Sequence, residues 1–558
     1  MITSVVPKNT MKTQFLLFTA MASLVLAQGG RGGAPTREAP VTDVPFSRIA
    51  AADQQPQNWL TYGGNNMGQR HSQLKQITTS NAKDLELKWV FQSRSLDKHE
   101  VTPLVVDGVM YTIQSPNDVI ALDAATGKTI WTYLHKPAPE TKNPCCGNLS
   151  RGVAILGDKV FLGSLDAQLI AINAKTGKEV WKTQVGDYKQ QYSITHAPLV
   201  IKDKVIVGVA GGEHGIRGFI AAYDANTGKE VWKFNTVPGP GEKGYETWSG
   251  DSYLHGGAPI WVTGTYDAAT NLTYWGTGNP GPDWDGDARL GDNLYSCSVI
   301  ALDADTGKLS WHYQFSPHNE FDWDATQVPV LADFEFEGRA RKTMLWANRN
   351  GVFYVLDRTT GEFLLGKPFT KTNWFTGFDE KGRPMAAPGI VPTKAGTLVY
   401  PGNQGGTNWY NPSFSPATGL FYIPAWENTS STYKKGEEPP EFHEGQSFAG
   451  VFPGAGSTTD DTFSSIAAID PKTGARKWTH RLSAASTEGG VLTTAGNVLF
   501  AGGRDGQFLA LDARDGKKLW ETNLGPSVSA GPMTYMVNGK QYLSIQAGAA
   551  LFTFAVKQ

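Results

Sequence analysis

Short stretches of alternating apolar and polar residues, each followed by a glycine turn, recur along the chain. One eleven-residue phrase appears seven times: ALDAATGKTIW from 121, AINAKTGKEVW from 171, AYDANTGKEVW from 222, ALDADTGKLSW from 301, VLDRTTGEFLL from 355, AIDPKTGARKW from 468 and ALDARDGKKLW from 510. The alternation predicts a strand that runs into Ala-x-Asp, and the glycine permits the positive φ that the turn requires. A second strand then carries the tryptophan. Each copy therefore predicts a β-hairpin that ends in a large apolar ring.

The spacing of these copies predicts the architecture. Most neighbouring copies lie 42 to 54 residues apart, which is about the period of a four-stranded propeller blade. The long gap before the copy at 468 leaves room for one more unit, and NPSFSPATGLFYIPA from Asn411 is the expected degenerate copy. One blade cannot bury both of its faces, so the copies must stack. We therefore expect an all-β chain that forms an eight-bladed β-propeller with tryptophan-docking repeats, the first blade being completed by strands from both chain ends. The alternative, an open solenoid, gives no reason for a tryptophan at one fixed position in each repeat.

Composition agrees with many short strands and excludes several function classes. Glycine is abundant at 63 of 558 residues, tryptophan numbers 17, and only 18% of residues are charged, which is atypical of coiled coils, helical bundles and disordered chains. The net charge of −2 gives no basic field for nucleic acid. Three cysteines cannot build a disulfide scaffold or a Cys₄ zinc site. No CxxCH haem motif occurs, and the ten histidines lack zinc-binding spacing.

The N-terminal residues have the pattern of a secretory signal. Lys8 and Lys12 precede an apolar run over 15–27, which ends in Val-Leu-Ala before Gln28. We expect residues 1–28 to be a signal peptide, 29–57 a flexible N-terminal arm and 58–558 the propeller. A membrane anchor is the alternative, but the run is shorter than the ~20 residues that a span needs. The prediction is an exported protein without a membrane span, periplasmic in a Gram-negative source.

Several short motifs outside the repeated phrase carry candidate chemistry. They are NPCCGNLSRG with adjacent Cys145 and Cys146, GVAGGEHGIRG with Glu213, GGAPIW ending in Trp261, WGTGNPGP with Asn279, and HNEFDWDAT with Asp322 and Asp324. A carboxylate and an amide oxygen suit a hard cation such as Ca²⁺. In an extended segment Asp322 and Asp324 point to the same side with Trp323 opposite, and two such charges repel unless a cation lies between them. Taken singly, each residue also has a structural interpretation, as a packed tryptophan, a turn acid or a pair of buried free thiols.

Two further features of the sequence are interpreted as structural only. The segment DWDGDARLGDNL from Asp283 looks like a calcium loop, but it lacks glycine at the sixth position and glutamate at the twelfth, so it is not an EF-hand. Cys297, in YSCSVIALD, lies in a predicted strand and is expected to be a core residue.

Together with the repeats, these motifs resemble those of the dehydrogenases that use pyrroloquinoline quinone (PQQ), the quinoprotein alcohol and methanol dehydrogenases. The resemblance covers essentially all of the mature chain. It implies a disulfide between Cys145 and Cys146 that lies flat against one face of PQQ, with Trp261 covering the other. It further implies cofactor contacts from Glu100, Arg151, Thr195, Gly211, Gly212, Arg349, Asn408 and Trp409. Arginines and hydroxyls are expected there because PQQ carries three carboxylates.

The resemblance also implies a metal site and a reaction. Its ligands are Glu213, Asn279 and Asp322, and Asp324 matches the extra carboxylate of the lanthanide-dependent members, so that a lanthanide is favoured over Ca²⁺. The cation would polarise the C5 carbonyl of PQQ while Asp322, as catalytic base, takes the proton of the alcohol and hydride passes to C5. Arg349 would steady charge on the reduced oxygen.

The implied partners are a small alcohol, oxidised to an aldehyde, and a separate cytochrome c that accepts the electrons, since the chain carries no haem motif. A homodimer is left open. Ala210, Pro259 and Glu488 depart from residues common in the family, which leaves cofactor hydrogen bonding and the identity of the substrate open. A PQQ-dependent sugar or polyol dehydrogenase and a non-catalytic propeller scaffold are the alternatives.

Overall fold

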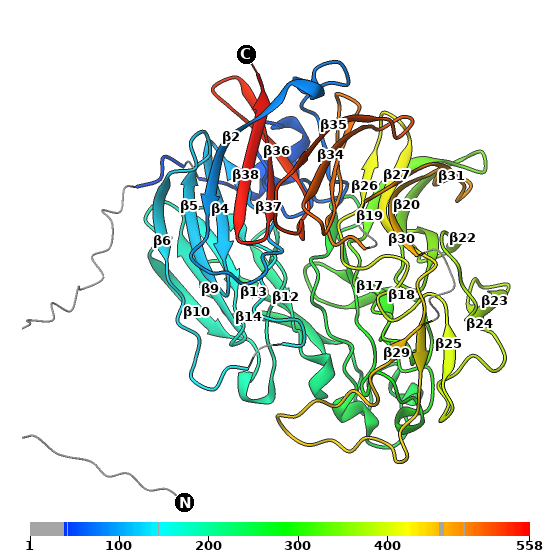
Figure 1. Ribbon diagram of the computed structural model, residues 1–558. Coiled ribbons are helices and arrows are strands. Elements are labelled where there is room, and N and C mark those ends of the chain that lie inside the picture. Colours follow the sequence, from blue (N-terminus) through cyan, green and yellow to red (C-terminus); the bar gives the residue numbers. More distant parts are fainter. Residues whose placement is uncertain (1–37, 42, 143, 457–461, 484–485, 558) are drawn as a thin grey trace, which may run out of the picture. The chain divides into compact units, whose positions relative to one another are not determined.

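The computed structural model describes residues 38–41, 43–142, 144–456, 462–483 and 486–557, and these are built almost wholly of β-strands (Figure 1). Their single α-helix is α1 (Phe46–Ala50). The 3-10 turns are η1 (Ala52–Gln54), η2 (Ala82–Asp84), η3 (Tyr188–Gln190), η4 (Gly212–His214), η5 (Tyr245–Thr247), η6 (Ser252–His255) and η7 (Asp287–Arg289). None of the helices in this part of the chain has the length and apolarity needed to cross a membrane. The predicted signal peptide, residues 1–28, lies outside the described residues.

Most strands belong to seven four-stranded sheets and one five-stranded sheet. The first four along the chain contain β3 (Leu104–Val106), β4 (Val109–Gln114), β5 (Asp118–Asp123) and β6 (Thr129–Tyr133); β7 (Ala154–Leu156), β8 (Lys159–Gly163), β9 (Gln168–Asn173) and β10 (Glu179–Gln184); β11 (Leu199–Ile201), β12 (Lys204–Gly208), β13 (Phe219–Asp224) and β14 (Glu230–Asn235); and β15 (Thr265–Asp267), β16 (Leu272–Gly276), β17 (Ser298–Asp303) and β18 (Leu309–Gln314).

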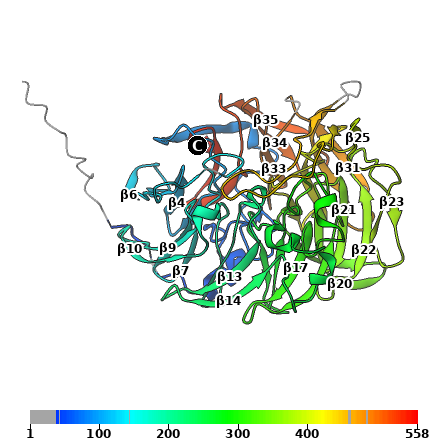
Figure 2. The ribbon, with the colours of Figure 1, turned by 90° about the horizontal axis from the view of Figure 1, so that it is seen from below.

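The other four contain β19 (Val330–Phe336), β20 (Arg339–Ala347), β21 (Val352–Asp357) and β22 (Phe363–Pro368); β26 (Ser413–Ser415), β27 (Leu420–Glu427), β30 (Phe463–Ile469) and β31 (Arg476–Arg481); β1 (His71–Ser72), β32 (Leu492–Thr494), β33 (Val498–Gly502), β34 (Gln507–Asp512) and β35 (Lys518–Asn523); and β2 (Leu85–Gln92), β36 (Met533–Val537), β37 (Lys540–Ala547) and β38 (Ala550–Val556). Smaller sheets pair β23 (Phe375–Phe378) with β24 (Pro384–Ala386), and β28 (Ser431–Tyr433) with β25 (Thr397–Val399) and β29 (Gly454–Ala455). Neighbouring sheets carry neighbouring colours in Figure 2, from cyan β6 and β10 through green β17 to orange β31.

The repeated phrase forms the last two strands of seven of these sheets, as predicted. In the first copy Ala121 pairs with Trp131 across the β5–β6 hairpin, and the other copies form β9–β10, β13–β14, β17–β18, β21–β22, β30–β31 and β34–β35. The Trp131 indole N–H donates to the carbonyl of Ala174 in the next sheet at 3.1 Å. Its ring covers Gly177, where an added Cβ would lie 2.7 Å from the ring. Glycine is therefore needed there both for its φ of +69° and for the tryptophan above it.

The same contact joins successive sheets along the chain. Indole N–H groups of four further tryptophans donate to carbonyls of the following sheet at 3.1–3.2 Å, namely Trp181 to Ala225, Trp232 to Ala304, Trp311 to Arg358 and Trp478 to Ala513. These five sheets thus place a tryptophan ring on the turn of the next one, whereas the copy at 355 ends in leucine and places Lys367 and Leu365 over Gly474. This explains why the phrase needs both its tryptophan and its glycine.

The prediction that the segment from Asn411 forms a separate blade is wrong. Its strands, β26 and β27, belong to the sheet of the copy at 468, because β27 pairs with β30 from Phe421 opposite Ile469. The sheet without the phrase is the one made from both chain ends, where Leu85 of β2 pairs with Val556 of β38. Blue β2 lies beside red β38 in Figure 1. The prediction that both ends share one sheet is confirmed, and Trp89 of β2 takes the place of the phrase tryptophan over Gly127.

Part of the segment expected to be a flexible arm is packed instead. Among the described residues 38–41 and 43–57, Val44 forms a β-bridge with Gly157, and the N–H of Ala39 donates to Lys175 at 2.9 Å. Ile49 of α1 is fully buried. The apolar residues among the glycines and prolines of this segment fix it against the sheets.

Candidate functional site

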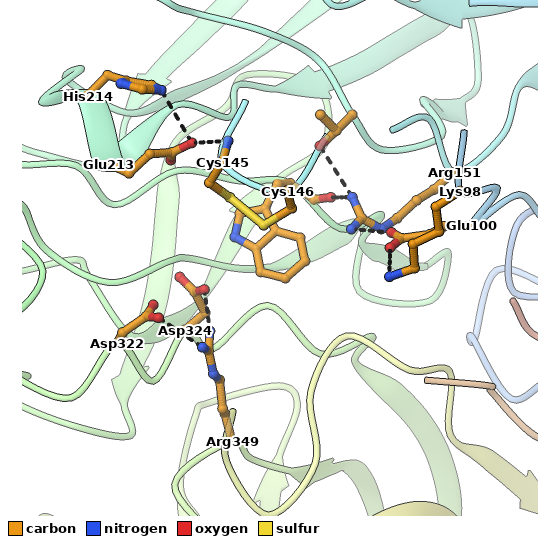
Figure 3. The surroundings of a disulfide bond; sticks show 12 residues. Lys98, Glu100, Cys145, Cys146, Arg151, Glu213, His214, Asp322, Asp324 and Arg349 are labelled. Atoms are coloured by element: carbon orange, nitrogen blue, oxygen red, sulfur yellow. Dashed lines mark hydrogen bonds and ion pairs between the residues drawn. A yellow bond between two sulfur atoms is a disulfide. The ribbon is translucent and has the colours of Figure 1, made fainter. Parts of the chain in front are cut away.

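The adjacent cysteines lie in the loop between β6 and β7 and form a disulfide. Both side chains are exposed, which excludes the alternative of two buried free thiols. The backbone N–H of Cys145 donates to Oε1 of Glu213 at 2.7 Å (Figure 3). Loops that are far apart in the sequence therefore bring the disulfide and a predicted cation ligand together. Cys297 is a buried free cysteine, as predicted, but it lies in the turn just before β17 and not in a strand.

Arg349 joins the two acids of the HNEFDWDAT motif. Its Nη1 lies 2.7 Å from Oδ2 of Asp324 and its Nη2 lies 3.0 Å from Oδ2 of Asp322 (Figure 3). The prediction that both acids point to one side is confirmed, although Asp322 is not extended. Its φ of +57° is left-handed, a conformation that costs a non-glycine residue free energy and that clusters at functional sites. Trp323 is buried on the other side, where its indole N–H donates to Gly402 at 3.0 Å.

Burial raises the pKa values of both acids. The pKa of Asp322 is raised to about 7, because burial and the charge of Asp324 together outweigh the lowering by Arg349. Burial also raises the pKa of Asp324, which is lowered by Arg349 and by a hydrogen bond from Trp261. An ionisable group poised near neutral pH in a buried site is suited to take up a proton.

A second set of predicted residues surrounds Arg151. Its Nη2 lies 2.6 Å from Oε2 of Glu100, and its Nη1 donates to Oγ1 of Thr195 at 3.3 Å. The guanidinium lies between two indole rings, 4.9 Å from the ring centroid of Trp261 and 4.8 Å from that of Trp409. Trp261 therefore links the two sets, because its ring faces Arg151 and its hydrogen bond reaches Asp324.

Lys98 is a site residue that the sequence reasoning missed. Its Nζ lies 2.8 Å from Oε1 of Glu100 and 2.6 Å from Oε2 of Glu488. Glu488, noted above only as a departure from the family, thus pairs with a cation at the edge of the Arg151 set. The closeness of Lys98 to Glu100 in the sequence was the available signal.

The remaining predicted residues contribute mainly backbone or local contacts. The N–H of Asn279 donates to Oδ1 of Asp324 at 2.7 Å. A Cβ at Gly212 would lie 2.9 Å from the ring of Pro259, and the left-handed φ of +119° at Gly211 favours glycine, so both glycines shape the turn that presents Glu213. Asn408 donates to the carbonyl of Gln404 at 3.3 Å, and its Oδ1 accepts the backbone N–H of Trp409 at 2.9 Å, so both contacts are local.

The comparisons with known proteins identify the family. A model of the PQQ glucose/ethanol/alcohol dehydrogenase β-propeller domain matches residues 59–367 and 482–543. The chain is 41% identical over 524 residues to the quinohemoprotein alcohol dehydrogenase ADH IIB of Pseudomonas putida, covering 90% of this chain and 74% of that protein. The chain belongs to the family of PQQ-dependent quinoprotein alcohol dehydrogenases. The predicted β-propeller fold, PQQ dependence and alcohol dehydrogenase class are thereby confirmed, and a non-catalytic scaffold does not account for the match.

Two further relatives carry informative names. A 1-butanol dehydrogenase (cytochrome c) of Thauera butanivorans is 40% identical, covering 88% of this chain and 74% of that protein. A solved europium-containing methanol dehydrogenase superposes with a TM-score of 0.86 at 33% identity, covering 91% of this chain and all of the other.

The residues present fit a quinoprotein cofactor and a hard cation. Arg151 and Lys98 supply positive charge for carboxylates, and Trp261 and Trp409 supply flat apolar faces for a planar ring system. The carboxylate oxygens of Glu213, Asp322 and Asp324 are of the kind that Ca²⁺ and lanthanide ions prefer. Within the described ranges, no three Asp, Glu, His or Cys side chains converge in metal-ligating positions, since Arg349 lies between Asp322 and Asp324.

Proposed function

We propose that the protein oxidises small alcohols to aldehydes with PQQ and a bound hard cation. The observation that carries this proposal is the position of Asp322, a partly buried acid whose Oδ2 lies 3.0 Å from Nη2 of Arg349 in the site beside the disulfide. A group of this kind accepts a proton from a substrate hydroxyl near neutral pH.

The fold that holds this site is proposed to be a single domain over residues 58–558, in which the eight sheets are blades of a closed ring. The tryptophan contacts between successive sheets support it. So do the contacts of the sheet made from both chain ends: Phe554 packs on Trp520 of the preceding sheet with ring centroids 5.4 Å apart, and the hydroxyl of Tyr535 donates to Ala124 of the next sheet at 2.6 Å. Loops from several blades would then meet at one cofactor.

The cofactor is proposed to lie between the disulfide and Trp261, with the Arg151 set around its carboxylates. The residues assigned to it are Glu100, Cys145, Cys146, Arg151, Thr195, Gly211, Gly212, Trp261, Arg349, Asn408 and Trp409. The cation is assigned to Glu213, Asn279, Asp322 and Asp324. A lanthanide is favoured over Ca²⁺ because Asp324 adds an anionic oxygen and because the similar methanol dehydrogenase contains europium.

When bound, PQQ supplies the two-electron oxidising power of the reaction, as hydride acceptor, and the cation polarises it. The chain's own residues handle the proton and the orientation. Oδ2 of Asp322 faces Arg349, so its other oxygen is the one assigned to the alcohol proton. The guanidinium, held at its Nε by the carbonyl of Asn403 at 2.7 Å, favours the ionised form of Asp322 and fixes its orientation.

The electrons are proposed to pass to a separate cytochrome c. This is supported by the absence of a CxxCH motif in the sequence and by the name of the 1-butanol dehydrogenase (cytochrome c). Export to the periplasm is proposed from the pattern over residues 1–28.

Reconstitution tests the proposed function directly. Purified protein loaded with PQQ and either La³⁺ or Ca²⁺ is assayed with an artificial dye acceptor against primary alcohols, polyols and aldose sugars. We expect dye reduction with the alcohols and faster turnover with La³⁺. Turnover of sugars alone would favour the sugar dehydrogenase alternative, and no turnover with any substrate after confirmed PQQ binding would refute the assignment.

A further inference from the structure

The loop between β16 and β17 contributes a carboxylate that the repeats and the resemblance did not indicate. Asp283 lies four residues after Asn279, in the segment rejected above as an EF-hand. The residue is only 6% exposed, and its Oδ1 is buried and accepts no hydrogen bond. A buried carboxylate oxygen is costly unless a donor or a cation satisfies it.

The side chain of Arg289 fixes the backbone around Asp283. Arg289, which is fully buried, donates from Nε to the carbonyl of Pro282 at 3.1 Å and from Nη2 to the carbonyl of Asn319 at 2.6 Å. The second contact ties the Asp283 loop to the loop that carries Asp322. The guanidinium of Arg289 donates its hydrogen bonds to carbonyl oxygens and none to the Asp283 carboxylate. Its positive charge therefore acts on that carboxylate only through space.

The electrostatic surroundings of Asp283 are those of the cation site. Burial raises the pKa of Asp283 well above its usual value, and the charges of Asp322 and Glu213 raise it further. Asp324 acts in the same direction, while the side chain of Asn279 adjoins the carboxylate and favours its ionised form. All four residues assigned to the cation therefore act on this one side chain.

We propose that Asp283 is a further ligand of the cation, bound through its unpartnered Oδ1. This inference rests on the proposed function, because it presupposes the cation site of Glu213, Asn279, Asp322 and Asp324. Binding through the Asp283 carboxylate would bring the carboxylates assigned to the cation to four, which together with the guanidinium of Arg349 between Asp322 and Asp324 sum to a charge of −3. A trivalent lanthanide neutralises that charge, whereas Ca²⁺ leaves one negative charge buried, so Asp283 selects for the trivalent ion.

Europium binding tests the assignment without measuring turnover. PQQ-loaded enzyme is titrated with Eu³⁺, and luminescence lifetimes in H₂O and D₂O give the dissociation constant and the number of metal-bound waters. In Asp283→Asn we expect binding at least tenfold weaker and about one additional bound water, because water replaces the lost carboxylate. The matched control is Asp287→Asn in the same loop, an exposed acid paired with Lys435 at 2.6 Å, which should bind Eu³⁺ like the wild type.

The outcomes separate this inference from the proposed function. Eu³⁺ binding by the wild type with unchanged affinity and hydration in Asp283→Asn overturns the Asp283 assignment and leaves the proposed function standing. A wild type that fails to bind Eu³⁺ overturns both. Should Asp283→Asn not fold, a crystal structure of the Eu³⁺-loaded wild type decides: Oδ1 at about 2.5 Å from the anomalous peak supports the assignment, and an Oδ1 outside coordination distance overturns it.

Discussion

The backbone N–H of Cys145 donates to the carboxylate of Glu213 across 2.7 Å, although the two residues lie 68 positions apart in the sequence. The disulfide ring thus bears directly on a side chain assigned to the cation. One small turn therefore positions both the disulfide proposed to contact the cofactor and the side chain proposed to bind the cation. Changes to the sulfur pair should therefore affect cation binding as well as cofactor binding.

Removal of the disulfide should weaken both ligands without unfolding the protein. In the Cys145→Ser, Cys146→Ser double variant we expect affinities for PQQ and La³⁺ to fall about tenfold, because the turn that positions the Cys145 N–H is no longer closed by the bridge. Fluorescence titration and isothermal calorimetry measure the two affinities. A double variant that keeps the wild-type affinities for PQQ and La³⁺ would contradict the disulfide's role.

Replacement of Asp322 should remove turnover while keeping the fold. Asp322→Asn retains the shape of the side chain but cannot take the alcohol proton, and loss of a general base costs roughly 10²–10⁴-fold in rate. We expect kcat in the dye assay to fall within that range and PQQ to remain bound, as read from its absorbance. Asp515→Asn, an exposed turn acid, serves as control. A variant at Asp322 with normal kcat would exclude it as the base.

The choice of cation should depend on Asp324. In Asp324→Asn the side-chain oxygen can still accept the hydrogen bond from the N–H of Asn279, while the negative charge that pairs with Arg349 is removed. We expect activation by La³⁺ to fall at least tenfold more than activation by Ca²⁺, because a trivalent ion loses more from a missing anionic ligand. Activation curves for both ions, measured on apo-enzyme loaded with PQQ, give the ratio. An equal loss for the two ions would remove the basis for favouring a lanthanide.

The repeats could be predicted from sequence because each turn imposes its own residues. Gly177 must allow a positive φ and lie under Trp131, and both requirements are visible within the phrase. The membership of the Asn411 segment was not predictable in this way, since whether β27 pairs with β30 depends on strands separated by a long loop. Spacing counts hairpins but does not say which hairpins share a sheet.

The same limit applies to the site. Cys145, Glu213 and Asp322 stand in motifs whose residue types point to cofactor and metal chemistry. Asp283 does not, because its importance arises only when the loop after Asn279 turns back toward Asp322. Its surrounding segment even suggested a different, unrelated calcium loop. Local pattern thus indicates chemistry within a motif, whereas convergence between loops requires the folded chain.

Stability should fall in mild acid because of a histidine buried in its neutral form. Burial lowers the pKa of His196 from 6.5 to about 4; Nδ1 lies 2.8 Å from the carbonyl of Ala197, and Nε2 accepts the N–H of Gly208 at 2.9 Å. Since the unfolded chain binds a proton near pH 6.5, the stabilisation is complete above that pH and is lost as pH falls toward 4, by up to about 3 kcal/mol. We expect the Tm of His196→Gln to be lower than that of the wild type at pH 7.5 but to decline less between pH 7.5 and 5. His443→Gln, at an exposed histidine, should retain the wild-type decline, and a His196→Gln curve parallel to the wild type would show that this imidazole does not control the acid sensitivity.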